Sequence, residues 1–152
     1  MYHYTDCGLD NVWLVNGYQA HDTPYGKGLS IDDIKGLHTC ISNELVGSAA
    51  GLTGAEFRFL RLELDMSQRQ VGLLLDKSEQ SVANWEKKRN SAVPKAADVI
   101  LRAIYREKTG NNAKITQLLA QLEAADRAQA HAKRRLAFKD VNHQWEPARD
   151  VA

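Results

Sequence analysis

Two helix-start signals constrain this chain more than any other feature of its sequence. Thr53 is followed three residues later by Glu56, and Ser67 is followed in the same way by Gln70. This spacing is the capping box, in which both side chains bond free backbone N–H groups at a helix N-terminus. Each box precedes apolar residues at helical spacing, which are Phe57, Leu60 and Leu64 in the first case and Val71 and Leu74 in the second. The sequence therefore predicts two short helices in succession.

Two more helices are expected directly afterwards. One begins near Ser78 and directs Val82 and Trp85 into the core. The other opens at Pro94, which suits a first helical position, and ends before Gly110. Its expected apolar face consists of Val99, Ile100, Ala103 and Ile104. Four such helices predict a compact bundle over residues 53–108.

The residues before this bundle are expected to form a small α+β unit over residues 1–46. Short strands are indicated by the run Val12–Val15 and by the alternation of Tyr2, Tyr4 and Asp6. Turns are indicated at Gly8–Asn11 and over His21–Gly28. Apolar residues at spacings of three and four predict a helix over Ile31–Val46, and the glycine-rich residues 47–52 are the expected linker.

The residues after the bundle, 109–152, predict one helix and a hairpin. The helix carries an apolar stripe of Ile115, Leu118, Leu119 and Leu122, which packs either on its own bundle or on a second subunit. Leu136 and Phe138 alternate, and Asp140–His143 suit a turn back towards Trp145. We expect this hairpin to pair with the N-terminal strands. The predicted fold class is mainly α, a four- to five-helix bundle with a small α+β unit before it and a helix plus hairpin after it.

Charge and composition narrow the functional classes. Residues 1–52 carry two Lys against six Asp and Glu, a net charge of −4, whereas residues 53–108 carry +3 and residues 109–152 carry +2. A basic remainder after an acidic third suits a polyanionic partner. Two cysteines do not form a secreted disulfide framework, and no apolar stretch is long enough to span a membrane. We expect an intracellular protein.

The sequence offers no catalytic or metal-binding pattern. It contains no nucleophile elbow, phosphate-binding loop or HExxH motif. His38 and Cys40, two residues apart on a predicted helix, do not face one ion. We therefore expect no enzyme activity, no cofactor and no metal.

The stretch SEQSVANWEKKRN, residues 78–90, carries the clearest functional signal. Residues of a helix are about 100° apart, so Gln80, Asn84 and Lys87 fall on the side opposite Val82 and Trp85. A carboxamide has a donor and an acceptor on one planar head, matching N6 and N7 at the major-groove edge of adenine. Cations at the end of the stretch suit phosphates. The pattern is typical of a helix that reads base edges.

Residues Leu52–Lys108 resemble the helix-turn-helix domain of the Cro/cI-type (XRE) repressors, with MSQRQVGLLL as the supporting helix and SEQSVANWE as the recognition helix. The resemblance implies base contacts at the start of the recognition helix and one turn later, by Ser78, Glu79, Gln80, Ser81 and Asn84. The resemblance also implies a phosphate contact by Gln68, at the start of the supporting helix, and we assign further phosphate contacts to the neighbouring cations Arg69, Lys77, Lys87, Lys88 and Arg89.

The resemblance also implies an internal ion pair between Arg61 and Glu86, and we assign structural roles to Val82 and Trp85. The family usually has Gly in the turn between the two helices, where this sequence has Asp76, a residue that tolerates the left-handed conformation. Glu79 would repel phosphates unless it accepts from a cytosine amino group or pairs with a cation.

The function expected from these signals is a dimeric, autoregulating transcriptional repressor in the bacterial cytoplasm. Its partner is double-stranded DNA with a palindromic operator, because a homodimer reads two half-sites. The alternative is an antitoxin similar to the MqsA and HigA types, which would bind a toxin protein and regulate its own operon. Zinc ligation of the MqsA kind is not expected, because YTDCGLDNVW contains one Cys and no CxxC. A third alternative is a sensor with an N-terminal pocket.

Overall fold

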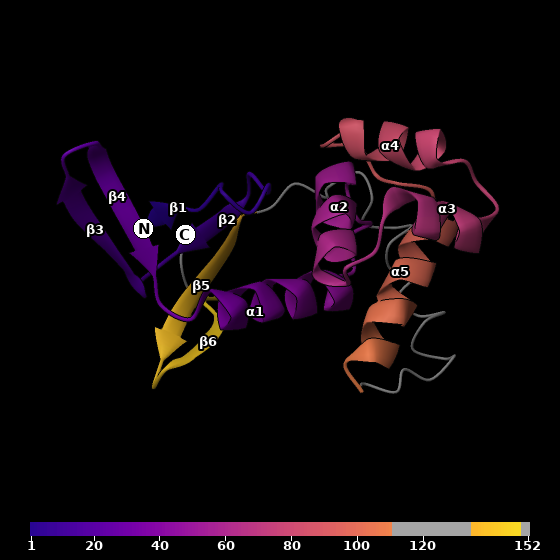
Figure 1. Cartoon of the computed structure of the whole chain (residues 1–152). Coiled ribbons are helices and arrows are strands. Elements are labelled where there is room, and N and C mark those ends of the chain that lie inside the picture. The colour runs from indigo at the N-terminus through magenta and orange to yellow at the C-terminus, as the bar shows by residue number, and fades with distance from the viewer. Residues whose placement is uncertain (111–134, 150–152) are drawn as a thin grey trace. The chain divides into compact units, whose positions relative to one another are not determined.

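The computed structural model describes residues 1–110 and 135–149 of the chain. These residues belong to two compact units, one comprising Met1–Ile41 with Arg134–Ala152 and the other Ser42–Lys133. Helix α1 (Ile34–Gly47) contributes residues to both units (Figure 1). The predicted fold class, mainly α, is wrong: strands in two sheets account for 23% of the described residues against 44% in helices, which makes the fold α+β.

A four-stranded sheet joins the two ends of the chain in the first unit. Its strands are β1 (Tyr2–His3), β2 (Val12–Leu14), β5 (Leu136–Val141) and β6 (Gln144–Pro147), in the spatial order β1-β2-β5-β6. The central pair β2 and β5 is parallel, and both outer pairs are antiparallel. The expected C-terminal hairpin and its pairing with an N-terminal strand are therefore confirmed.

The first unit places its core between this sheet and α1. Val12, Leu14 and Phe138 alternate along the paired strands and are fully buried, as are Leu37 and Ile41 on the helix. The helix begins at Ile34, three residues later than predicted, because the Asp33 carboxylate accepts from the backbone N–H of Gly36 at 3.1 Å. That bond satisfies one of the N–H groups a helix start leaves free.

A second, two-stranded sheet occupies the stretch that the sequence pattern indicated as turns. Strands β3 (Tyr18–Thr23) and β4 (Gly26–Ile31) pair in antiparallel register with a tight turn at Pro24 and Tyr25. Apolar residues meet across the strands, Tyr18 opposite Ile31 and Ala20 opposite Leu29. The prediction of a turn over His21–Gly28 failed because its Gly, Pro and Asp residues hid this alternation, and because the strands are largely exposed.

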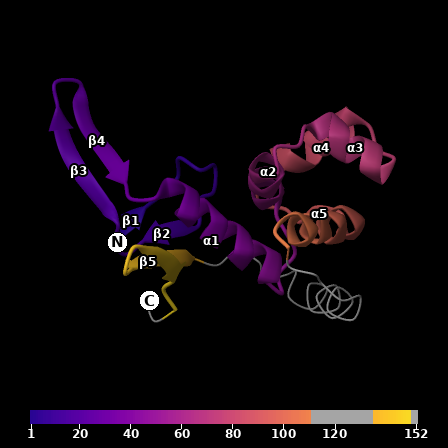
Figure 2. The ribbon, with the colours of Figure 1, turned by 60° about the horizontal axis from the view of Figure 1, so that its bottom comes forward.

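The described residues of the second unit form four helices besides their part of α1, namely α2 (Gly54–Glu63), α3 (Gln68–Leu75), α4 (Glu79–Lys87) and α5 (Lys95–Lys108) (Figures 1 and 2). Both predicted capping boxes are present, with Thr53 and Ser67 as the N-caps. Pro94 is the N-cap of α5 and not its first residue. The core of this unit includes Phe57, Leu60 and Val82, all fully buried.

Two apolar residues expected inside the bundle are less buried than predicted. Leu74 is 59% exposed, and Trp85 is only partly buried, with its ring edge-on to Phe57 at a centroid distance of 6.2 Å. Leu74 is exposed because α3 is short and buries only Val71 and Gly72.

The predicted apolar face of α5 is also not the buried one. Val99, Ala103 and Ile104 are half-buried and Ile100 is exposed. The buried residues are Ala97, Asp98, Leu101, Arg102 and Tyr105. Apolar spacing could not identify this face, because two of its members are charged residues that neutralise each other.

The helix predicted around Ile115–Leu122 lies outside the described residues. Among the helices that the structure describes, none combines the length and the apolar character that a membrane crossing requires.

Candidate nucleic-acid interface

Helices α3 and α4 form a helix-turn-helix whose turn depends on two residues. Asp76 ends α3 in the left-handed conformation, at φ 54° and ψ 44°, as expected of an Asp that replaces Gly there. A Cβ atom at Gly72 would lie 2.5 Å from the carbonyl oxygen of Lys77, so any larger residue would push α3 away from the turn. The Ser78 hydroxyl then caps α4 by accepting from the N–H of Ser81 at 3.1 Å.

The predicted ion pair between Arg61 and Glu86 is present and buried. Arg61 donates from Nε and Nη2 to the two carboxylate oxygens at 2.7 and 2.8 Å, and the side chains are 8% and 4% exposed. Arg61 also donates to the carbonyl of Met66, at 2.9 Å, in the loop before α3. Such a bidentate contact fixes the orientation of both groups. It therefore ties α2 to α4 and to the start of the helix-turn-helix.

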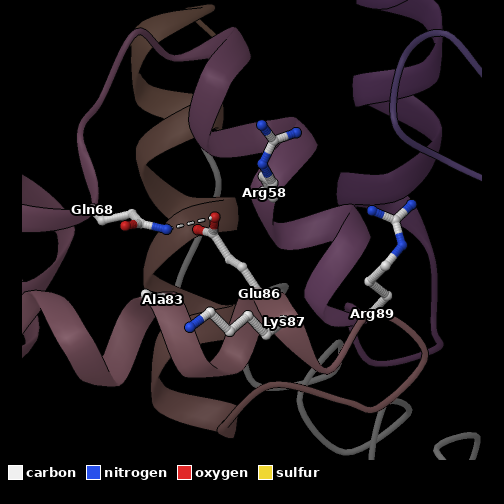
Figure 3. A pocket seen from close by; sticks show the side chains of 6 residues that line it. All are labelled: Arg58, Gln68, Ala83, Glu86, Lys87 and Arg89. Atoms are coloured by element: carbon white, nitrogen blue, oxygen red, sulfur yellow. Dashed lines mark hydrogen bonds between the residues drawn. The ribbon is translucent and has the colours of Figure 1, made fainter.

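Gln68, expected to contact a phosphate, has its amide beside this ion pair. Its Nε2 donates to Oε1 of Glu86 at 3.1 Å (Figure 3). An amide nitrogen carries two N–H groups, so one donor remains for another partner. The Glu86 carboxylate thus holds Gln68 in place at the first residue of α3.

The two carboxamides expected to read bases bond to each other. Gln80 Nε2 donates to Asn84 Oδ1 at 3.0 Å, and both side chains are exposed on α4. This bond leaves the Gln80 carbonyl oxygen as an acceptor and the Asn84 amide as a donor. The pair therefore presents a fixed acceptor and donor on one exposed face, the combination that the edge of adenine requires.

The remaining residues assigned to base contacts differ in their availability. Glu79 is exposed in the first turn of α4. Ser81 is half-buried, and its hydroxyl lies 3.0 Å from that of Ser78, which is already engaged as the helix cap. Ser78 therefore has a structural role in addition to any contact with DNA.

A pocket of about 490 Å³ opens beside this face, where α2, α3 and α4 meet (Figure 3). Its lining comprises Arg58 from α2, Gln68 from α3, Ala83, Glu86 and Lys87 from α4, and Arg89 after α4. Helices α2 and α4 pack closely beside the pocket, since a Cβ atom at Gly54 of α2 would lie 2.2 Å from the carbonyl oxygen of Trp85 on α4. The pocket brings together three of the predicted phosphate-binding residues, Gln68, Lys87 and Arg89.

Arg58 is the lining residue that sequence reasoning missed. It is exposed and lies one helical turn before Arg61, on the same side of α2. That spacing was the available signal, because Arg61 was already expected to pair with Glu86 of the recognition helix. The other predicted phosphate contacts, Arg69, Lys77 and Lys88, are exposed and lie outside the pocket.

Within residues 1–110 and 135–149, no group of three or more His, Cys, Asp or Glu side chains is placed to hold a metal ion. Cys7 and Cys40 do not form a disulfide, and both are partly buried. Comparisons with protein-family models, with curated proteins and with solved structures found no match to this chain.

Proposed function

We propose that this protein is a sequence-specific DNA-binding transcriptional regulator, acting as a repressor of its own gene. The observation that carries the proposal is the bonded pair of Gln80 and Asn84 on an exposed helix that a buried ion pair holds in place. Direct readout requires polar groups at fixed positions on an element narrow enough for the major groove. Helix α4 supplies both, and the cationic pocket beside it suits the flanking phosphates.

The proposal includes a homodimer on a palindromic operator in the cytoplasm. Helix α4 has nine residues, so one copy reaches few base pairs. Two copies related by a two-fold axis would read half-sites about one helical turn apart. No catalytic role is part of the proposal.

The deciding experiment compares DNA from upstream of the gene with random DNA of equal length at several salt concentrations. We expect tighter binding to the upstream DNA and a salt dependence on both. Equal affinity for the two DNAs would contradict sequence-specific regulation, and absence of binding to either would contradict DNA binding altogether.

Replacing Gln80 or Asn84 with Ala is expected to cost about 1–3 kcal/mol of binding free energy on the upstream DNA, with little change on random DNA. Because the two side chains bond to each other, the double variant should lose less than the sum of the single losses. Gln19→Ala, at an exposed carboxamide on β3, is the matched control. Equal losses on both DNAs would show that the pair does not read bases.

Replacing Lys87 with Ala is expected to weaken binding to every sequence. Loss of one phosphate contact should reduce the slope of log K against log salt by about one. Lys35→Ala, at an exposed lysine on α1, removes the same charge elsewhere as a control. A loss confined to the upstream DNA would assign Lys87 to base readout.

The antitoxin alternative has one observation in its favour. The net charge of −4 falls on residues 1–52, and most of these belong to the first unit and not to the helix-turn-helix. Such a unit suits a basic protein partner. Co-purification of the chain with the product of a neighbouring gene would support this function, and DNA binding by the chain alone would not exclude it.

A further inference from the structure

The β3–β4 hairpin forms a sheet of its own in the first unit. Its two strands pair only with each other in the described part of the chain, so each keeps one open edge. All of β3 except Tyr18 is exposed, and Tyr25 in the tip is 100% exposed. In Figures 1 and 2 the hairpin extends away from the four-stranded sheet. A two-stranded hairpin without a further partner is at best marginally stable in water, so this one gains from a third strand.

The base of the hairpin is nevertheless held in place. Asp32 donates its backbone N–H to the carbonyl of Gly17 at 2.9 Å, and the Asp32 carbonyl accepts from the Trp145 indole at 2.8 Å. Gly17 has φ 78°, and a Cβ atom there would lie 2.4 Å from the Trp145 ring. The rings of Tyr2 and Tyr18 have their centroids 5.3 Å apart. The strands are therefore anchored at one end and exposed along the rest, which lowers the entropic cost of binding a partner.

Of the two open edges, the edge of β3 is the one suited to pairing. Strand β4 has Lys27 between Gly26 and Gly28, and both residue types make a strand edge a poor template for another strand. Strand β3 contains no Lys, Gly or Pro. An edge strand presents a row of unpaired backbone N–H and C=O groups, which an added strand can bond. The edge of β3 therefore offers a docking site for one extended strand.

Charge favours a second copy of this chain as the source of that strand. The hairpin has one acid and one lysine, Asp22 and Lys27, which lie opposite each other, so its net charge is zero with His neutral. The net charge of −4 on residues 1–52 therefore lies outside the hairpin, and a basic partner would be drawn there instead. Two neutral hairpins meet without repulsion. A two-fold interface must also be self-complementary, and an antiparallel pairing of β3 with itself meets that condition.

We propose that β3 of one copy pairs in antiparallel register with β3 of a second copy, with Ala20 at the two-fold axis, and that this pairing is the homodimer interface. Ala20 opposite Ala20 keeps Tyr18 and Ala20 of both copies on one side of the joint sheet, whereas a shift by one residue would separate them. This register also avoids placing His21 opposite itself. The interface rests on the proposed function only in that reading two half-sites requires two copies. Because the contact is short, the dimer should dissociate on dilution.

The test is sedimentation velocity of the full chain without DNA, over a series of concentrations, for the wild type, Ala20→Glu, Ala20→Lys and an equimolar mixture of these variants. Residue 20 is exposed, so neither substitution disturbs a core. Each variant alone places two like charges opposite each other and should raise the dimer dissociation constant at least about tenfold. The mixture places Glu opposite Lys and should restore the dimer. Misfolded variants could not rescue each other in this way.

Gln144→Glu and Gln144→Lys are the matched controls, because Gln144 is exposed on β6, an edge strand of the other sheet. Both should dimerise as the wild type does. A wild type that stays monomeric up to about 1 mM would overturn the interface. A dimer that persists in either Ala20 variant, or a mixture that stays monomeric, would overturn it as well. Because no DNA is present, these results leave the proposed function to the separate comparison of upstream and random DNA.

Discussion

Replacing Arg61 with Ala is expected to destabilise the helical unit by about 3–5 kcal/mol, because it leaves the Glu86 carboxylate buried without a compensating charge. Glu86 is 5% exposed, so its carboxylate depends on protein donors more than on solvent. The substitution also removes the bond to the carbonyl of Met66. A change of this size is a large part of the stability of a small domain.

Tryptophan fluorescence can measure this loss of stability, because a single residue supplies the signal from the helical unit. Trp85 is the only tryptophan outside the first unit, since the other two are Trp13 and Trp145. In a background with both of these changed to Phe, fluorescence during urea unfolding reports on the helical unit. Arg58→Ala removes an exposed arginine one turn away and should change the free energy of unfolding by no more than about 0.5 kcal/mol.

A double variant separates the charge from the packing. Arg61→Met with Glu86→Leu removes both charges, and the loss should be much smaller than in the single variant because no buried charge remains. If Arg61→Ala costs no more than Arg58→Ala, then the ion pair does not stabilise the helix-turn-helix.

Local sequence signals were sufficient for the parts of the fold that depend on neighbouring residues. The capping boxes at Thr53 and Ser67 were predicted because the donor and acceptor lie within one helical turn. The C-terminal hairpin was predicted because Leu136 and Phe138 alternate before a turn. In both cases the interaction that forms the element is contained in the pattern itself.

The failures occurred where a strand is exposed or where the buried residues are themselves charged. The β3–β4 hairpin is largely exposed, so it shows little of the apolar alternation that identifies a buried strand. The face of α5 was misassigned because Asp98 and Arg102 are buried as a pair, and a pattern of apolar residues cannot register them. Because the two sheets contain more strands than expected, the fold class is α+β and not mainly α.

Some features of the candidate site could likewise be predicted from the sequence, and others could not. The pair of Arg61 and Glu86 followed from a family resemblance, and the shared face of Gln80 and Asn84 followed from helical spacing. The bond between these two carboxamides and the position of Arg58 in the lining of the pocket could not be predicted, because they depend on rotamers and on how α2 packs against α4. The sequence alone does not show which exposed cations line the same pocket.

Replacing Arg102 with Ala is expected to lower the free energy of unfolding at least as much as replacing Arg61 does, because Arg102 forms an ion pair and also donates to three carbonyls. It pairs with Asp98, and the two residues are 2% and 5% exposed. It also donates to the carbonyls of Val46, at 3.3 Å, of Ala50, at 2.7 Å, and of Ser48. The substitution therefore leaves a buried charge and removes donors from three carbonyls, one in the last turn of α1 and two just after it, so we expect a loss of about 3–5 kcal/mol or more.

The neighbouring Arg106 is the appropriate comparison. It donates to the same Val46 carbonyl, at 3.1 Å, and is half-buried, whereas Arg102 is fully buried. Burial, and then repulsion from Arg102, lower the pKa of Arg106. Arg106→Ala should cost less than Arg102→Ala, because Arg106 is half-buried and the buried pair of Asp98 and Arg102 stays intact.

Hydrogen exchange identifies where the Arg102 substitution acts. In the wild type, Asp98 accepts from the Leu52 N–H at 3.0 Å, while Arg102 holds the carbonyls of residues 46–50. We expect the amides of residues 48–52 to lose protection in Arg102→Ala before those of α3 and α4 do, because the segment loses its anchor on α5. Uniform loss over all helices would show that Arg102 supports the whole bundle, and unchanged protection would contradict the role of this network.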